Sequence, residues 1–250
     1  MPHSILFSFA HPDDESFSGV GTAMMYAERG IRTALVTATR GQSGKCGDPP
    51  VCTPQELPAR REQELREAAA IGGIAEVHVL DYRDQALADA PRDEILRTLV
   101  GHIRRLRPAI VATFDPDGFN RHADHVAIAR FTSDAIAAAG DARWFPATGA
   151  AHAVTRLLWT PMMPPWEAAL MPDLGGRAGV DFVLDIRAWR ERKAAALRAH
   201  RTQHLSINRC FFDRAELDTI LGIEVWRQAW GPALAHRPAP DIFEGIEAAR

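Results

Sequence analysis

Short apolar runs alternate with longer amphipathic stretches through the first 140 residues, and this alternation is typical of repeated strand and helix units. The apolar runs predict strands over residues 4–10, 33–39, 77–80 and 109–114. The amphipathic stretches predict helices over residues 17–29, 54–71, 92–107 and 123–139. Glycine or proline follows each helix at once and would end it. The pattern therefore predicts an α/β fold of the Rossmann-like type, with a mostly parallel sheet and helices on both faces.

The last 110 residues follow a less regular pattern. They predict strands over 155–160 and 180–186, a loop over the Pro- and Met-rich segment 161–172, helices over 187–204 and 213–221, and an edge strand over 223–229. After Pro232 the prolines favour an extended tail over the surface. Since no repeat or linker marks a boundary, we expect a single domain over residues 1–250, with a less regular part from about residue 141.

Composition narrows the classes of protein. The 29 Lys and Arg residues nearly balance the 32 Asp and Glu residues. This balance argues against nucleic-acid binding, because proteins that bind nucleic acids carry clusters of basic residues. No basic segment precedes the first apolar run, and no stretch approaches the ~20 apolar residues that span a bilayer. We therefore expect a cytoplasmic protein with no nucleic-acid partner and no membrane span. Three cysteines, at positions 46, 52 and 210, are expected to be reduced there, and a Cys46–Cys52 bond is left open for oxidising conditions.

Two clusters of histidine and aspartate follow apolar runs. His11-Pro12-Asp13-Asp14-Glu15 comes directly after the first predicted strand, and His122-Ala123-Asp124-His125 comes shortly after the fourth. In a doubly wound sheet the first and fourth strands are commonly neighbours, and a crevice opens at their carboxyl ends. We therefore expect the two clusters to face one another.

Imidazole nitrogens with carboxylate oxygens are a ligand set that suits zinc. The absence of nearby cysteine favours a catalytic zinc site over a structural one. Capping of the helix near Phe17 is another explanation for Asp13 or Asp14. The spacing does not tell which aspartate binds the metal and which transfers protons. Gly19-Val20-Gly21 lacks the third glycine of a dinucleotide site, so packing of a helix on the sheet explains it better.

Together, the two clusters resemble motifs of the PIG-L/LmbE family of zinc-dependent N-deacetylases. The matching segments are Ala10-His11-Pro12-Asp13-Asp14-Glu15 and the later His122-Ala123-Asp124-His125. That family includes deacetylases of N-acetylglucosaminyl-phosphatidylinositol and of mycothiol and bacillithiol biosynthesis. Further segments agree with the family pattern: 39–44, 61–65, 103–108 and 200–203. The likeness covers most of residues 4–204. Gln42 and Ala123 depart from it, because the family often has Glu and usually has Pro there.

The resemblance implies a role for each matching residue. His11, Asp14 and His125 would bind one Zn²⁺ ion per chain. Asp13 would be the general base, and a protonated His122 would stabilise the oxyanion. Asp124 would orient His122. Zinc would make its bound water acidic enough for Asp13 to deprotonate as that water attacks the acetamide carbonyl.

Residues that contact the substrate are harder to predict from the sequence than the metal ligands. Arg61, Gln42, His200 and Gln203 are candidates for substrate binding, although Arg61 could equally anchor a loop or lie on a solvated face. A helical stripe that includes His200 could equally serve packing. The insertion 45–53 is a candidate substrate loop. Met162, Met163, Trp166 and Met171 are candidates for an apolar wall.

The leading hypothesis is a zinc amidohydrolase that removes an N-acetyl or other acyl group from an N-acetylglucosamine-type or related amino sugar, giving acetate and a free amine. A metal-dependent phosphoesterase is one alternative, since it uses the same loop position, often with a second metal. A non-catalytic sugar-binding module is the other. The expected partner is a small N-acylated amino sugar or conjugate, and a homo-oligomer is left open.

Overall fold

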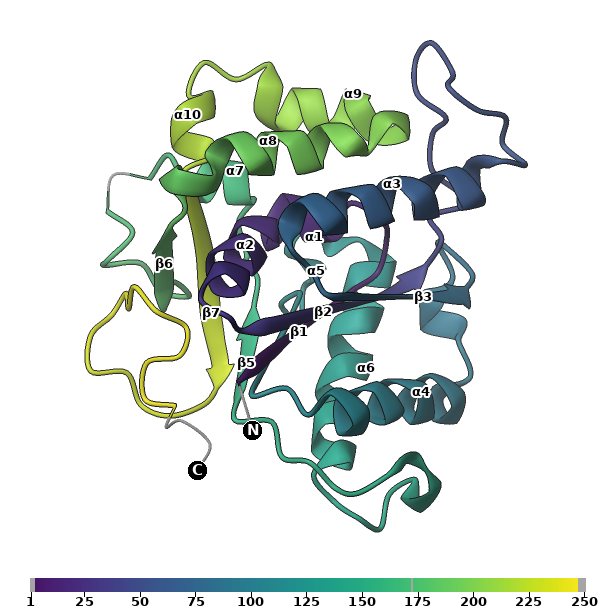
Figure 1. Ribbon diagram of the computed structural model, residues 1–250, viewed down its shortest axis with the longest axis vertical. Coiled ribbons are helices and arrows are strands. Elements are labelled where there is room, and N and C mark those ends of the chain that lie inside the picture. The colour runs from purple at the N-terminus through teal and green to yellow at the C-terminus, as the bar shows by residue number, and fades with distance from the viewer. Residues whose placement is uncertain (1–2, 172, 247–250) are drawn as a thin grey trace.

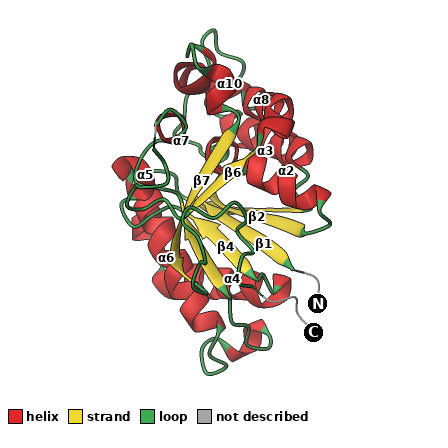
Figure 2. Ribbon diagram, turned by 90° about the vertical axis from the view of Figure 1, so that its left-hand side faces the viewer, coloured by secondary structure: helices red, strands yellow, loops and turns green. Residues whose placement is uncertain are grey.

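The computed structural model describes residues 3–171 and 173–246, and these form a seven-stranded mixed sheet in the order β3-β2-β1-β4-β5-β7-β6 (Figures 1 and 2). The strands are β1 Ser4–Phe9, β2 Arg32–Thr39, β3 Glu76–Tyr82, β4 Ile110–Thr113, β5 Arg156–Trp159, β6 Phe182–Asp185 and β7 Ile223–Trp230. β1 to β5 are mutually parallel, and β7 runs antiparallel to both β5 and β6. The predicted fold class, an α/β protein with a mostly parallel sheet, is confirmed.

Helices cover both faces of the sheet. They are α1 Asp14–Ser18, α2 Val20–Glu28, α3 Leu57–Gly72, α4 Arg92–Leu106, α5 Gly118–Arg121, α6 Ala123–Ala139, α7 Pro165–Ala168, α8 Arg190–Ala199, α9 His204–Ile207 and α10 Leu217–Ile220. In Figure 1, α2, α3 and α8 pack together on one side of the sheet, and α4 and α6 pack together on the other. Every residue of β1 is buried, as expected of a strand covered on both faces.

The first predicted helix is divided in two at Gly19, which separates α1 from α2. A Cβ atom at Gly19 would lie 2.9 Å from the Phe7 ring, and one at Gly21 would lie 2.3 Å from Ile186. These two glycines therefore serve close packing, as the sequence indicated. The break also turns α1 independently of α2, so that α1 can lie against the end of β1.

The expected edge strand over 223–229 is wrong in its position, because β7 lies between β5 and β6 and β6 forms the edge. Burial of Trp226, which is fully inaccessible, is consistent with this inner place. The tail after Pro232 also differs from the prediction. Ala239 bridges to Phe182 of β6, and both Ala239 and Ile242 are buried in the main core.

The C-terminal helices are shorter than predicted. The segment 187–204 contains α8 between short 3₁₀ turns, and 213–221 contains only α10. The segment 161–172 includes the single turn α7, while Pro172 lies outside the described residues. Because local periodicity cannot distinguish one long helix from several short turns, tertiary packing determined these boundaries.

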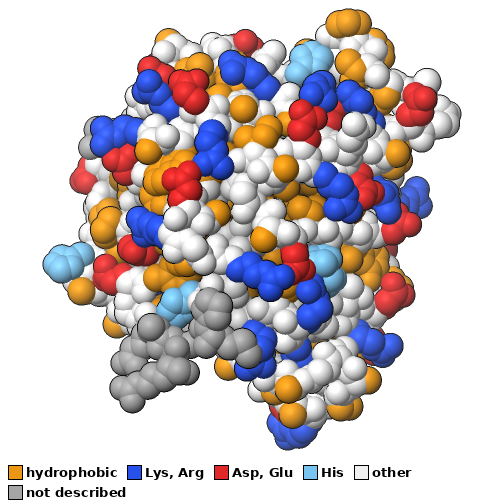
Figure 3. Space-filling model, in the orientation of Figure 1, with side chains coloured by type: hydrophobic (Ala, Val, Ile, Leu, Met, Phe, Trp, Pro, Cys, Tyr) orange, Lys and Arg blue, Asp and Glu red, His pale blue; other side chains and the backbone are white. Residues whose placement is uncertain are grey.

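The surface carries both signs of charge. On the face shown in Figure 3, basic and acidic side chains are interspersed and form no field of a single sign. Within residues 3–171 and 173–246, no helix has the length and apolar character needed to cross a bilayer.

Candidate active site

A cavity of about 320 Å³ lies outside the carboxyl ends of β1 and β4, the position where open α/β sheets bind ligands. The order β2-β1-β4 makes β1 and β4 neighbours, so the loops after them meet at one edge. Seven of the ten residues predicted to bind metal, catalyse the reaction or bind substrate line this cavity: His11, Asp13, Asp14, Arg61, His122, His125 and Gln203. The fold thus brings the two histidine and aspartate clusters together.

Side-chain atoms of the three predicted ligand residues converge at the bottom of the cavity. His11 Nδ1 lies 3.2 Å from His125 Nε2 and 3.5 Å from Asp14 Oδ2, and His125 Nε2 lies 3.3 Å from Asp14 Oδ1. Ligands about 2.0–2.1 Å from a tetrahedral zinc ion would be separated by about 3.3 Å, and the three spacings, which involve both Asp14 oxygens, are close to that value. This His-His-Asp cluster can therefore hold a metal.

The backbone holds two of these ligands in place. Asp14, in the first turn of α1, accepts hydrogen bonds at Oδ2 from the backbone N–H groups of Ala10, at 3.1 Å, and His11, at 2.7 Å. His125 Nδ1 lies 3.2 Å from the Gly118 carbonyl oxygen, which can only accept. That bond places the hydrogen of His125 on Nδ1 and leaves the Nε2 lone pair directed toward Asp14 and His11.

The other nitrogen of His11 meets two carboxylates. Its Nε2 lies 3.2 Å from Asp124 Oδ2 and 3.2 Å from Asp84 Oδ1. Burial alone would lower the pKa of His11, but hydrogen bonds with these carboxylates and Asp14 raise it well above its usual value. Because a metal-bound histidine usually donates its second N–H to a carboxylate, Asp84 and Asp124 suit the positioning of His11 for coordination through Nδ1.

Asp84 was missed by the sequence reasoning. It follows β3, whose carboxyl end lies at the same edge of the sheet as those of β1 and β4. The available signal was an aspartate shortly after the third predicted strand. Asp81 offered the same signal, and in the structure Asp81 is exposed and pairs with Arg40.

Asp13 has an unusual backbone conformation beside the metal-ligand cluster. Its φ angle is 121°, a region that non-glycine residues rarely adopt. Its Oδ2 lies 3.3 Å from the Arg61 guanidinium. Burial raises the pKa of Asp13 to about 6, although the Arg61 charge opposes this shift. The carboxylate is therefore a stronger base than an exposed aspartate.

Arg61 is a buried cation that anchors loops. Its guanidinium donates to the carbonyl oxygens of Gly41, at 2.8 Å, and Pro12. Gly41 has a φ angle of 62°, and a Cβ atom there would lie 2.0 Å from Arg61 Nη1. Of the alternatives that the sequence left open for Arg61, the solvated face is wrong and the loop anchor is confirmed. Because Arg61 also lines the cavity, a contact between Arg61 and the substrate stays a prediction.

His122 and Asp124 are arranged differently from the expectation. The Asp124 carboxylate accepts from the backbone N–H groups of Gln85, at 2.6 Å, and Leu87, at 3.1 Å, and contacts His11. His122 is instead oriented through Nδ1, which accepts from the Asp124 backbone N–H at 3.2 Å. Burial, together with His11 and His125, lowers the pKa of His122. This favours a neutral His122 that carries its hydrogen on Nε2, instead of the protonated form that was expected.

Two predicted substrate-binding residues lie outside the cavity. The amide of Gln42 donates to the Tyr82 carbonyl oxygen at 3.3 Å, and His200 is buried with its Nε2 2.8 Å from Glu15 Oε1. Neither lines the cavity, so both assignments are corrected. Of the four residues proposed for an apolar wall, only Trp166 is in the lining; Met162, for example, is 61% exposed.

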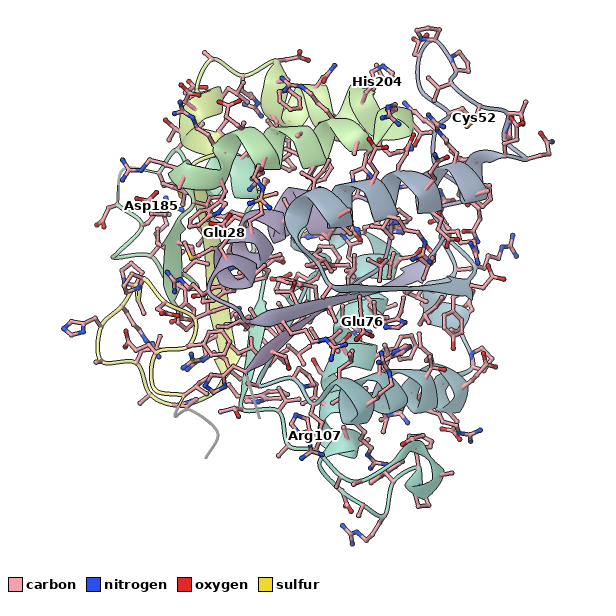
Figure 4. The ribbon with its side chains drawn as sticks, viewed as in Figure 1. Glu28, Cys52, Glu76, Arg107, Asp185 and His204 are labelled. Carbon is pink, nitrogen blue, oxygen red and sulfur yellow. The ribbon has the colours of Figure 1, made fainter. Side chains whose placement is uncertain are left out.

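The insertion 45–53 lies beside the cavity without lining it. Figure 4 shows this loop, with Cys52 labelled, projecting beyond α3, and His204 on the neighbouring helical segment. The loop is held at Lys45, whose carbonyl oxygen accepts from Gln203 at 2.9 Å, and at Asp48, whose carbonyl oxygen accepts from His204 at 3.1 Å. Cys46, Cys52 and Cys210 are free thiols. Ser43 and Gly44, just before the insertion, are the nearest lining residues.

The fold and the cavity define an α/β protein with a potential metal site at the carboxyl edge of its sheet. A model of the family described as PIG-L, GlcNAc-PI de-N-acetylase, matches residues 6–136, which is more than half of the chain. The chain therefore belongs to the PIG-L family, as its motifs indicated.

Sequence relatives with assigned activities support this placement. A 1D-myo-inositol 2-acetamido-2-deoxy-alpha-D-glucopyranoside deacetylase of Rhodococcus jostii is 30% identical over 241 residues, covering 80% of this chain and 81% of that protein. A probable N-acetyl-alpha-D-glucosaminyl L-malate deacetylase 2 of Bacillus anthracis is 36% identical over 134 residues, covering 53% of this chain and 59% of that protein. Both are named as deacetylases.

Solved structures share the fold. The conserved protein TT1542 from Thermus thermophilus aligns with a TM-score of 0.71 at 26% identity, covering 92% of this chain and 96% of that one. The N,N'-diacetylchitobiose deacetylase from Pyrococcus horikoshii aligns with a TM-score of 0.69 at 20% identity, covering 90% and 83%. GalB of Pseudomonas putida, a 4-carboxy-2-hydroxymuconate hydratase, also aligns at 0.69 and 20%, covering 95% and 100%. Since a hydratase shares the fold, the reaction has to be argued from the site.

Proposed function

We propose that this protein is a zinc-dependent N-deacetylase that acts on an N-acetylglucosamine-type conjugate and releases acetate and a free amine. The observation that carries the proposal is the convergence of His11, Asp14 and His125 with Asp13 beside them in one cavity. Two relatives named as deacetylases, one of a glucosaminyl malate and one of an inositol glucopyranoside, support N-deacetylation as the reaction. The cytoplasmic location remains a prediction.

His11 Nδ1, His125 Nε2 and a carboxylate oxygen of Asp14 would hold the ion. A zinc ion bound there would act as a Lewis acid toward the amide carbonyl and make a bound water acidic enough to be deprotonated near neutral pH. Three protein ligands without cysteine leave room for water and substrate, which a closed structural site does not. Asp84 and Asp124 would keep the His11 ring in the required orientation through Nε2.

Asp13 would move the proton. Its carboxylate takes a proton from water as the water oxygen bonds to the amide carbon, and returns that proton to the amine as the carbon–nitrogen bond breaks. The elevated pKa of Asp13, about 6, suits a group that must both accept and release a proton near neutral pH. The ion pair with Arg61 restrains the orientation of the carboxylate.

His122 would stabilise the carbonyl oxygen as negative charge develops on it. With Nδ1 accepting from the Asp124 backbone N–H, the neutral ring has its hydrogen on Nε2. That N–H can donate to the developing oxyanion, and a donor of this kind contributes ~3 kcal/mol in other enzymes. Protonation of His122 is therefore not required for this role.

The test is a combined assay of metal content and acetate release. We expect purified protein to bind one zinc ion and to release equal amounts of acetate and amine from N-acetylglucosamine conjugates. Asp13→Asn should retain zinc and lose about 1,000-fold in kcat. Asp81→Asn is the matched control, because Asp81 is 83% exposed and pairs with Arg40 away from the cavity.

Two results would contradict the proposal. Zinc-loaded protein that binds amino sugars but releases no acetate would indicate a binding module. Two metal ions per chain with phosphate released from model esters would indicate a phosphoesterase. A fully active Asp13→Asn variant would remove Asp13 from the mechanism while leaving the reaction class intact.

A further inference from the structure

The open side of the cavity has two unlike walls. An aromatic wall consists of Phe17, Phe119 and Trp166, and a polar wall consists of Gln203, Ser206, Arg209 and Cys210. The aromatic wall starts near the metal-ligand cluster, since the Phe119 ring centroid lies 6.3 Å from that of His125 and 5.8 Å from that of Trp166. The polar wall comes from the helical turns that follow α8.

A π-helix over Asn208–Phe212 places two consecutive residues of the polar wall, Arg209 and Cys210, in the cavity lining. Gln203, Ser206 and Cys210 follow the spacing of one helix face. The wider turn, in which the Asp213 N–H donates to the Asn208 carbonyl at 2.8 Å, brings Arg209 into the lining as well. Single π-turns are frequent at functional sites.

Arg209 has no carboxylate partner. No Asp or Glu oxygen of residues 3–171 and 173–246 lies within 4.0 Å of its guanidinium, whereas Arg61, the other arginine in the lining, pairs with Asp13. The carboxylates that line the cavity are already engaged: Asp13 by Arg61, Asp14 by both histidines, and Asp84 by His11. Arg209 is therefore a cation at the cavity without a counter-charge.

The surroundings of Arg209 suit an anion. Its guanidinium lies beside the Cys210 thiol and lowers the pKa of that thiol, an effect that burial outweighs. Ser206 and Gln203 add hydrogen-bonding groups along the same wall. Guanidinium groups bind carboxylate and phosphate through two parallel hydrogen bonds, which is the recognition that this wall offers.

We propose that Arg209 recognises an anionic oxygen group, a carboxylate or a phosphate, attached to the amino sugar of the substrate. The acetamide would lie at the metal-ligand cluster, the sugar along the aromatic wall, and the anion at the polar wall. This inference rests on the proposed deacetylase function and narrows its substrate class to anionic conjugates.

The test compares the methyl and carboxymethyl glycosides of N-acetylglucosamine, which differ by one carboxylate, and adds N-acetylglucosamine 1-phosphate. We expect the wild-type protein to prefer an anionic substrate in kcat/KM by about tenfold, and Arg209→Gln to lose that preference. Raising ionic strength should reduce the preference as well, because Arg209 is exposed. The two anionic substrates separate carboxylate recognition from phosphate recognition.

Arg130→Gln is the matched control, because Arg130 is exposed on α6 and does not line the cavity. It should keep the wild-type preference. A preference that survives Arg209→Gln, or no preference in the wild type, would overturn the proposal even if all three substrates are hydrolysed. That outcome would leave the deacetylase function standing.

Binding measurements separate this inference from the catalytic one. Calorimetry with the same substrates on Asp13→Asn protein, with and without Arg209→Gln, reports recognition without turnover. A tenfold tighter binding of an anionic substrate that disappears with Arg209 supports the proposal even if no acetate is released. Equal binding of neutral and anionic compounds contradicts it.

Discussion

The floor of the cavity and its open side are built in contrasting ways. The floor is formed by His11, Asp14, Asp84 and His125 and is backed by Asp124, which contacts His11; each of these residues is at most 7% exposed. Its residues lie in the loops and helices that follow the parallel strands β1, β3 and β4, and each polar side chain has a protein partner. The open side comes from short helices, is half-buried or exposed except at Cys210, and contains Arg209, which has no carboxylate partner among the described residues.

This difference separates reaction from recognition. Buried carboxylates and imidazoles keep one geometry because an unpaired polar atom there would be costly. Short turns such as α5, α7 and the π-helix lie outside the sheet and can vary with little cost to it. We therefore expect changes at the floor to affect metal and turnover, and changes at the open side to affect substrate preference.

The largest effect is expected from removing a ligand at the floor. His125→Ala takes away one of the three proposed metal-binding residues, so the variant should lose zinc at stoichiometric concentration and at least about 1,000-fold in kcat. Metal analysis after gel filtration and an acetate assay measure both. His236→Ala, which changes an exposed histidine far along the chain, should do neither. Full zinc occupancy in His125→Ala would show that another residue completes the site.

An intermediate effect is expected at Asp84. Asp84→Asn removes one of two carboxylates from His11 Nε2 while keeping the shape, so zinc affinity should fall about tenfold. Competition with a chelator of known affinity measures this. Asp81→Asn, three residues earlier and exposed, should leave the affinity unchanged. If Asp84→Asn changed only KM, Asp84 would be a substrate contact and not a positioning residue.

The smallest effect is expected at the aromatic wall. Trp166→Ala removes the ring that contacts Phe17 and Phe119, which should raise KM about fivefold to tenfold and leave zinc affinity unchanged. Trp144→Ala is the control, since Trp144 is 50% exposed and does not line the cavity. A loss of zinc in Trp166→Ala would contradict the separation of floor from open side.

Local sequence patterns were most informative at the strand ends. The apolar run 4–10 and the segment 109–114 predicted β1 and β4, and the residues after them meet in one cavity. Patterns were least informative for residues such as Gln42 and His200, whose motif matches did not reveal side-chain direction. Gln42 bonds to Tyr82 and His200 to Glu15, each away from the cavity. A motif identifies a segment, whereas packing decides which side chains of that segment face a ligand.

The sequence by itself determined the α/β class, the mostly parallel sheet and the two clusters that contain His11, Asp14 and His125, because apolar periodicity and residue chemistry are local properties. Only the tertiary structure decided that Asp84 joins Asp124 at His11, that the Asp124 carboxylate contacts His11 instead of His122, and that Arg209 lines the cavity without a carboxylate partner among the described residues. These depend on strand order, helix breaks and side-chain direction. All three are settled by long-range packing, which no local pattern records.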